Sequence, residues 1–141
     1  MTNNKTTSAK KINDRKWYFF DASNKVLGML ASEIAKVLIG KNTPMFSPNQ
    51  NTGGVVVVTN VEKIALTGNK MKKKTYIHHT GYPKGLRVQK MEKVFEKDPR
   101  QILIRAVEGM LPKNKLRKER MSNLHVYVGP EHPHKAQEAA K

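Results

Sequence analysis

A cluster of lysines lies directly beside a group of planar rings near the middle of this sequence, and together they could bind RNA. The lysines are Lys70, Lys72, Lys73 and Lys74, and the rings are Tyr76, His78, His79 and Tyr82. Lysines neutralise phosphates, while planar rings stack on unpaired bases or form hydrogen bonds with them. The alternative is a solvated lysine turn above aromatic side chains of the core. We favour RNA binding because the whole chain is strongly basic.

A second basic segment follows an apolar helical run that Pro112 breaks. Its cations are Lys113, Lys115, Arg117, Lys118 and Arg120, against one acid, Glu119. The apolar run 124–128 comes directly after it. We interpret the segment as a cationic loop held between apolar flanks, whose long donors suit phosphate oxygens. The alternative is a solvated charged loop, which most charge runs are.

Histidines occur in three places and raise the question of a metal site. They are His78 with His79, His125, and His132 with His134. Adjacent residues on a strand point to opposite faces, so His78 and His79 cannot easily share one ion. The spacing also matches no structural zinc pattern. We expect no metal and no cofactor, and we assign the histidines to hydrogen bonds with phosphate or sugar, with an ordinary surface position as the stronger alternative for the last pair.

The sequence shows no catalytic motif. Gly53 and Gly54 precede the apolar run 55–58, whereas a phosphate-binding loop has its glycines after a strand and before a helix. Only 11 acids are present, so paired-carboxylate or magnesium chemistry has few candidates. We expect no enzyme and no small-molecule substrate. An RNA-processing or nucleotide-dependent enzyme is the rival function, and nonspecific DNA packing is a weaker third.

The composition indicates a polyanionic partner. The 141 residues include 27 Lys or Arg, which gives a formal charge of +16 and a pI near 10.2. There is no cysteine, which fits a reducing compartment. No run approaches the roughly 20 apolar residues that span a bilayer, and the polar start has no signal-peptide core. These features predict a cytoplasmic protein without a membrane partner.

Strand-like and helical segments alternate, which predicts one α/β domain over residues 16–129 with a mixed, largely parallel sheet. Expected strands are 17–20, 55–58, 64–66, 76–79, 86–89 and 124–128, of which 76–79 and 86–89 pair as a hairpin. The first expected helix follows the turn and N-cap residues 21–24, has an apolar stripe from Leu27 to Leu38, and ends at Gly40 as a left-handed cap. Further helices are expected over 90–97 and from Asp98 or Pro99 to Met110, with one helical turn at 61–63. The valine run 55–58 is typical of a central strand with helices on both sides. Gly28 costs its helix up to ~1 kcal/mol, which close approach of backbone or phosphate would explain as well as simple tolerance. We read residues 1–15 as a flexible basic N-terminal arm and residues 130–141 as a C-terminal tail with a short helix.

A series of motifs, in order, resembles a known family. The motifs are Asp21-Ala22, Leu27-Gly28, Leu30-Ala31, Val55 to Asn60, Leu66 to Lys70, Tyr76 to Gly81, Gly109 to Lys113, Val126 to Gly129, Glu131 to His134 and Ala136-Gln137. From about Trp17 to Gln137 the chain resembles large-subunit ribosomal protein thirteen, the universal uL-thirteen family, in its bacterial form. The resemblance implies a three-layer α/β/α domain that binds the large, 23S-type rRNA and supports early assembly of the large ribosomal subunit. It also implies neighbouring ribosomal proteins as partners and no catalysis, and it leaves messenger RNA open as a further partner.

The resemblance also points to particular residues. Residues 70 and 76–81 match the family's conserved-motif loop, and Lys113 with the basic residues after it matches a second loop. The chain departs from the family at Met29, usually basic, at Asn51 and Gly54, usually acidic, and at 116–118, commonly a glycine-rich segment. With the arm and the remaining loops, the predicted RNA-binding set is Lys10, Lys11, Arg15, Lys41, Lys70, Lys72, Lys73, Lys74, Tyr76, His78, His79, Thr80, Tyr82, Lys84, Arg87, Lys113, Lys115, Arg117, Lys118, Arg120, His132 and His134.

Overall fold

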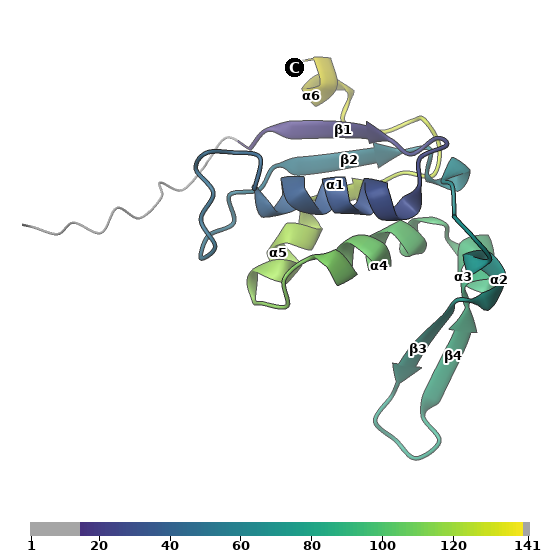
Figure 1. Ribbon diagram of the computed structural model, residues 1–141. Coiled ribbons are helices and arrows are strands. Elements are labelled where there is room, and N and C mark those ends of the chain that lie inside the picture. Colours follow the sequence, from purple (N-terminus) through teal and green to yellow (C-terminus); the bar gives the residue numbers. More distant parts are fainter. Residues whose placement is uncertain (1–14, 140–141) are drawn as a thin grey trace, which may run out of the picture.

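The computed structural model describes residues 15–139, and its centre is a three-stranded parallel sheet (Figure 1). Strand β2 (Val55–Thr59) lies between β1 (Trp17–Asp21) and β5 (Leu124–Val126). All four valines of β2 are buried, as expected for a strand that is covered on both faces. The predicted α/β class and the central strand are confirmed.

Three helices cover one face of this sheet and enclose the main core (Figure 1). They are α1 (Leu27–Ile39), α4 (Arg100–Met110) and α5 (Leu116–Ser122). The apolar stripe of α1 is buried on the sheet, as its three- and four-residue spacing predicts. Gly40 ends α1 in the left-handed conformation at φ 89°, also as expected. No helix within residues 15–139 is long and apolar enough to cross a membrane.

The start of α1 differs from the sequence-based expectation. Residues 21–24 form the predicted turn, in which the backbone N–H of Ser23 donates to Asp21 Oδ1 at 3.0 Å. That hydrogen bond holds the pKa of Asp21 below its usual value, with Asn60 adding to the effect. The N-cap of α1 is Val26, however, which forms no side-chain cap. The predicted capping role of 21–24 was wrong because the chain runs two residues further before the helix begins.

The opposite face of the sheet carries the C-terminal tail and the short helix α6 (Lys135–Ala139), which lies above β1 in Figure 1. The rings of Trp17 and Phe19 in β1 contact the tail segment before α6. The Trp17 centroid lies 5.0 Å from that of His134, and the Phe19 centroid lies 5.6 Å from that of His132. Within the described residues, the third layer is therefore one short helix and a histidine-rich segment.

A hairpin projects away from the parallel sheet (Figure 1). It consists of β3 (Thr75–His79) and β4 (Leu86–Lys90), which pair antiparallel and confirm the predicted hairpin. The parallel and antiparallel pairs thus form two separate sheets. The short helix α2 (Lys70–Lys73) precedes β3, and α3 (Met91–Lys97) follows β4. Of the other short elements, Val61–Lys63 forms the predicted helical turn, while the predicted strand 64–66 is reduced to a single bridge between Val26 and Ala65.

The second basic segment is not a loop throughout. The chain breaks at Pro112 as predicted, but α5 begins at Leu116 and brings Arg120 into the core, where its side chain is 1% exposed. Leu116 and Met121 lie half-buried in the same helix. The inward face of α5 includes an arginine, which interrupts its apolar spacing. The amphipathic helix was therefore not predicted from the sequence. Arg120 is accordingly a core residue in this structure, and its prediction as an RNA contact is corrected.

Replacing Arg120 with alanine should lower the free energy of unfolding by about 2 kcal/mol, because it removes the largest fully buried side chain. Its Nε has no hydrogen-bond partner, so Arg120→Met should recover most of that stability. Urea denaturation of both variants measures the difference. Lys118→Ala is the control, since Lys118 is exposed and its loss should change stability by less than about 0.5 kcal/mol. Wild-type stability of Arg120→Ala would contradict the buried placement.

Candidate nucleic-acid interface

The lysines of residues 70–74 are presented outward by a tight turn and a short helix. Gly68 reverses the chain at φ 66°, a conformation that suits glycine. Lys70, Lys72, Lys73 and Lys74 are all exposed, and α2 contains no buried residue. Within residues 15–139, the ion pairs involve Arg100, Arg117 and His132 but none of these lysines. The four cations are therefore available to an external anion.

Tyr76 connects this lysine cluster to α4. The Arg105 guanidinium carbon lies 4.6 Å from the centroid of the Tyr76 ring, and Lys74 Nζ lies 5.5 Å from it. Such cation–π contacts hold both cations in place. Burial raises the pKa of the Tyr76 phenol, with Arg105 acting in the opposite direction, so the ring stays neutral. Tyr76 thus positions two cations rather than offering a free ring to a base.

Arg105 lies beside the lysine cluster and the hairpin, and sequence reasoning did not single it out. In the chain it appears as one polar residue on an amphipathic helix, 31 positions from Lys74. Only the fold brings it to the hairpin. Arg105 could be identified only by knowing that α4 packs beside the basic turn. That knowledge requires the tertiary structure.

The two faces of the hairpin differ in chemistry. His78 pairs with Arg87, and Tyr76 with Gln89, on the face toward α4, where Arg105 and Glu108 lie. Ile77, Leu86 and Val88 share the other face and are 66%, 58% and 55% exposed. His78 and His79 point to opposite faces, as predicted for neighbours on a strand.

The tip of the hairpin exposes one aromatic ring. Tyr82 is 76% exposed and so is free to stack on a base. Around it, the Gly81 N–H donates to His79 Nδ1 at 2.9 Å, and Thr80 Oγ1 donates to the Gly85 carbonyl at 3.4 Å. Lys84 is exposed at φ 60°. His79 and Thr80 therefore shape the turn that presents Tyr82 and Lys84.

The basic residues around α5 divide into two groups. Lys113, Lys115 and Lys118 are exposed. Arg117, in contrast, donates from Nη2 and Nε to the Glu108 carbonyl at 2.6 and 3.1 Å and also pairs with the Glu108 carboxylate. Arg117 thus satisfies a carbonyl in the last turn of α4, which would otherwise lack a partner. Three of the five predicted cations remain available here.

The remaining predicted contacts are scattered. Lys41 is exposed on the loop after α1, and Arg15 is half-buried before β1. Lys10 and Lys11 lie outside the described residues. The structure therefore gathers the residues of α2 and the hairpin with Arg105, and it does not bring Arg15 or Lys41 into that group.

The tail histidines pack on the sheet instead of lying on the open surface. The His132 side chain is 7% exposed, and its Nε2 lies 3.3 Å from Glu138 Oε2. His134 Nε2 is 3.0 Å from the Tyr127 hydroxyl, and its ring centroid is 4.9 Å from that of His125. Within residues 15–139, no group of three or more possible ligands is arranged to hold a metal ion.

This histidine cluster predicts a pH dependence of folding. Burial lowers the pKa of His125, and nearby His134 adds to the effect. The unfolded chain therefore takes up the proton more readily, and stability present above about pH 6.5 should decline as the pH falls. His125→Phe keeps a ring beside Trp17 and cannot titrate, so its unfolding free energy should fall less between about pH 7.5 and 5.5. Parallel declines of the wild type and the variant in denaturation experiments would contradict this role of His125.

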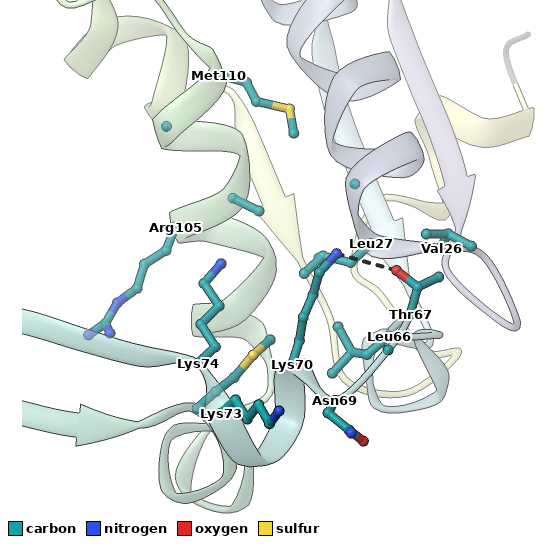
Figure 2. Close-up of a pocket in the computed structure, with 15 residues that line it drawn as sticks. Val26, Leu27, Leu66, Thr67, Asn69, Lys70, Lys73, Lys74, Arg105 and Met110 are labelled. Carbon is teal, nitrogen blue, oxygen red and sulfur yellow. Dashed lines mark hydrogen bonds between the residues drawn. The ribbon is translucent and has the colours of Figure 1, made fainter.

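A cleft of about 900 Å³ lies beside the lysine cluster, between α1 and α4 with α2 at its base (Figure 2). Its cations are Lys70, Lys73, Lys74 and Arg105, and among the described residues that line it none is acidic. Lys70 Nζ donates to Thr67 Oγ1 at 3.3 Å. The hairpin and this cleft form one continuous basic region, since Arg105 and Lys74 line the cleft and also contact Tyr76.

Comparison with known proteins shows the family of this chain. Residues 15–133 match the family model described as Ribosomal protein L13. The chain belongs to the ribosomal protein L13 family. It is 50% identical over 136 residues to the large ribosomal subunit protein uL13 of Geobacter sulfurreducens, with 95% of each chain covered, and 52% identical over 134 residues to that of Citrifermentans bemidjiense, with 94% of each covered. The L13 family consists of structural ribosomal proteins, so the expectation that this chain is not an enzyme is confirmed.

Asn51 and Gly54, two positions at which the resemblance implies acids, lie beside the buried start of β2. A Cβ added at Gly54 would lie 2.6 Å from Cε2 of the Tyr18 ring, so a side chain has no room at this position. Both side-chain amide atoms of Asn51 are buried without a hydrogen-bond partner. At the third departure, Met29 is 67% exposed in the first turn of α1. The first two changes thus concern packing at the start of the central strand.

Proposed function

We propose that this protein is a structural component of the large ribosomal subunit, in the cytoplasm, that binds the large rRNA and supports early subunit assembly beside neighbouring ribosomal proteins. Its L13-family membership and the names of its relatives support this role. So does a formal charge of +16, which calls for a polyanionic partner. Messenger RNA forms no part of the proposal.

The observation that carries the proposal is the basic region of α2, the hairpin and Arg105. Its cations are exposed or held over Tyr76, and none forms an ion pair within residues 15–139. Exposed Tyr82 adds a stacking platform for unpaired bases, which structured RNA offers and duplex DNA does not. The contacts we propose are Lys70, Lys72, Lys73, Lys74, His78, His79, Thr80, Tyr82, Lys84, Arg87, Arg105, Lys113, Lys115 and Lys118, with Arg15 and Lys41 at the margin.

A competition experiment tests this function against its rivals. The affinity of the protein for the large rRNA and for duplex DNA of similar length is measured at matched salt. We expect the rRNA to bind at least roughly a hundredfold more tightly, because only the rRNA supplies unpaired bases and a defined shape. Equal affinities would favour DNA packing. Turnover of RNA or nucleotide by the purified protein would contradict a purely structural role.

A further inference from the structure

Two glycines that line the cleft have no structural role in the packing of this chain. Gly28 lies in the first turn of α1 and Gly109 in the last turn of α4, and a Cβ built at either would meet nothing within 4 Å. Neither has a positive φ. Glycine within a helix costs roughly 1 kcal/mol relative to alanine, and no contact at the Cβ position with any of residues 15–139 compensates for it. Both glycines thus border open space between α1 and α4.

The walls of this open space combine apolar surface with positive charge. Figure 2 shows Met110 extending from α4, with Leu27 and Leu66 on the other side. Lys70 rises from α2 toward this space, and the side chain of Lys74, the residue after α2, extends in front of α4 (Figure 2). A ligand that fits must therefore present a flat apolar part and an anionic part close together. A nucleotide has both, in its base and its phosphates.

The size and position of the cleft fit a nucleotide held by RNA. A volume of about 900 Å³ lies within the range of roughly 300–1,000 Å³ for ligand sites, and it is too small for a duplex. Arg105 and Lys74 join the cleft to the hairpin, so a strand that follows the hairpin's basic face reaches the cleft directly. We propose that the cleft receives one unpaired nucleotide of the rRNA, with its base against Leu27, Leu66 and Met110 and its phosphates at Lys70 and Lys74. This inference rests on the proposed rRNA binding.

Filling the cleft without changing its charge tests the inference. The variant Gly28→Leu/Gly109→Leu places two side chains in the open space, and Gly129→Leu is the control, because Gly129 also has open space at its Cβ but lies outside the cleft. Affinity for the large rRNA should fall roughly 5- to 100-fold in the double variant, as loss of one stacked base predicts. The salt dependence of binding should stay unchanged, because no cation is removed. Ribose probing should show one unpaired nucleotide that the wild type protects and the double variant does not.

The outcomes separate this inference from the function on which it rests. If wild-type protein fails to select the rRNA, the proposed function itself is wrong. If the wild type selects the rRNA and the filled variant matches it in affinity and footprint, the cleft is empty in the complex and the inference is overturned. Ala106→Leu fills the same cleft from α4 and provides the same comparison should the double variant fold poorly. Saturable binding of free AMP to the isolated protein, without a difference in footprint, would assign the cleft to a free nucleotide instead.

Discussion

Replacing Lys70, Lys73, Lys74 and Arg105 together with glutamine should weaken binding to the large rRNA by roughly 100- to 1,000-fold near physiological salt. These four cations line one cleft and form no ion pair within residues 15–139. Each phosphate contact contributes about 0.7 to 0.9 to the slope of log affinity against log salt, so the slope should become shallower by about 3 to 4. Filter binding or fluorescence anisotropy over a salt series measures both quantities.

The control for this variant removes the same charge elsewhere. Lys16, Lys36, Lys63 and Lys135 are exposed and outside the proposed interface, and their replacement by glutamine lowers the net charge by the same four units. If the basic region binds the phosphates, the control should keep most of the affinity and slope. Equal losses of affinity in the two variants would mean that net charge alone drives binding. That result would contradict the proposed interface.

Gly53→Ala should lower the free energy of unfolding by about 3 kcal/mol or more, which is the largest stability effect we expect from one added methyl group. A Cβ at Gly53 would overlap the Leu38 carbonyl oxygen and lie 2.6 Å from its carbon, so the backbone itself must move. The Gly54 N–H donates to the Val37 carbonyl at 3.3 Å, which shows how closely this segment follows the end of α1. Gly53 therefore serves close packing on the end of α1, while Gly54 serves close packing against Tyr18 of β1.

The matched control is the same substitution at Gly28. Its Cβ meets nothing within 4 Å and its backbone is helical, so Gly28→Ala should raise stability by up to about 1 kcal/mol. Thermal and urea denaturation of the two variants compare them directly. Near-equal stabilities would show that the last turn of α1 moves aside for the new methyl group, contrary to the tight contact described here.

The sequence predicted those elements whose residues carry a local and regular signal. The apolar stripe of α1, the valine run of β2 and the hairpin around residues 80–85 all follow from spacing within a short window. The same approach failed for α5, because its inward face includes Arg120, which any count of apolar spacing treats as a surface residue. Tertiary burial overrode the local pattern at that position.

The candidate site was only half visible in the sequence, for a different reason. The lysines at 70–74 are contiguous, so they are obvious from the chain alone. The cleft is not, because Gly28, Lys70 and Arg105 meet there from three distant segments. The sequence predicted that the Tyr76 ring stacks on a base, whereas in the structure it lies against Lys74 and Arg105. Arg105 comes from α4, so this contact could not be predicted from the local sequence. Local patterns locate charged groups, whereas the pairing of those groups depends on how the helices pack.

The central claim, that this chain is a structural component of the large ribosomal subunit, is tested most directly by sedimentation. A cell lysate is separated on a sucrose gradient at low and high salt, and this protein is quantified by mass spectrometry beside other large-subunit proteins. We predict that it migrates with the large subunit in near-equal amount to those proteins and stays there after the salt wash. Protein found mainly at the top of the gradient, or only on precursor particles, would contradict the claim and identify a transient factor instead.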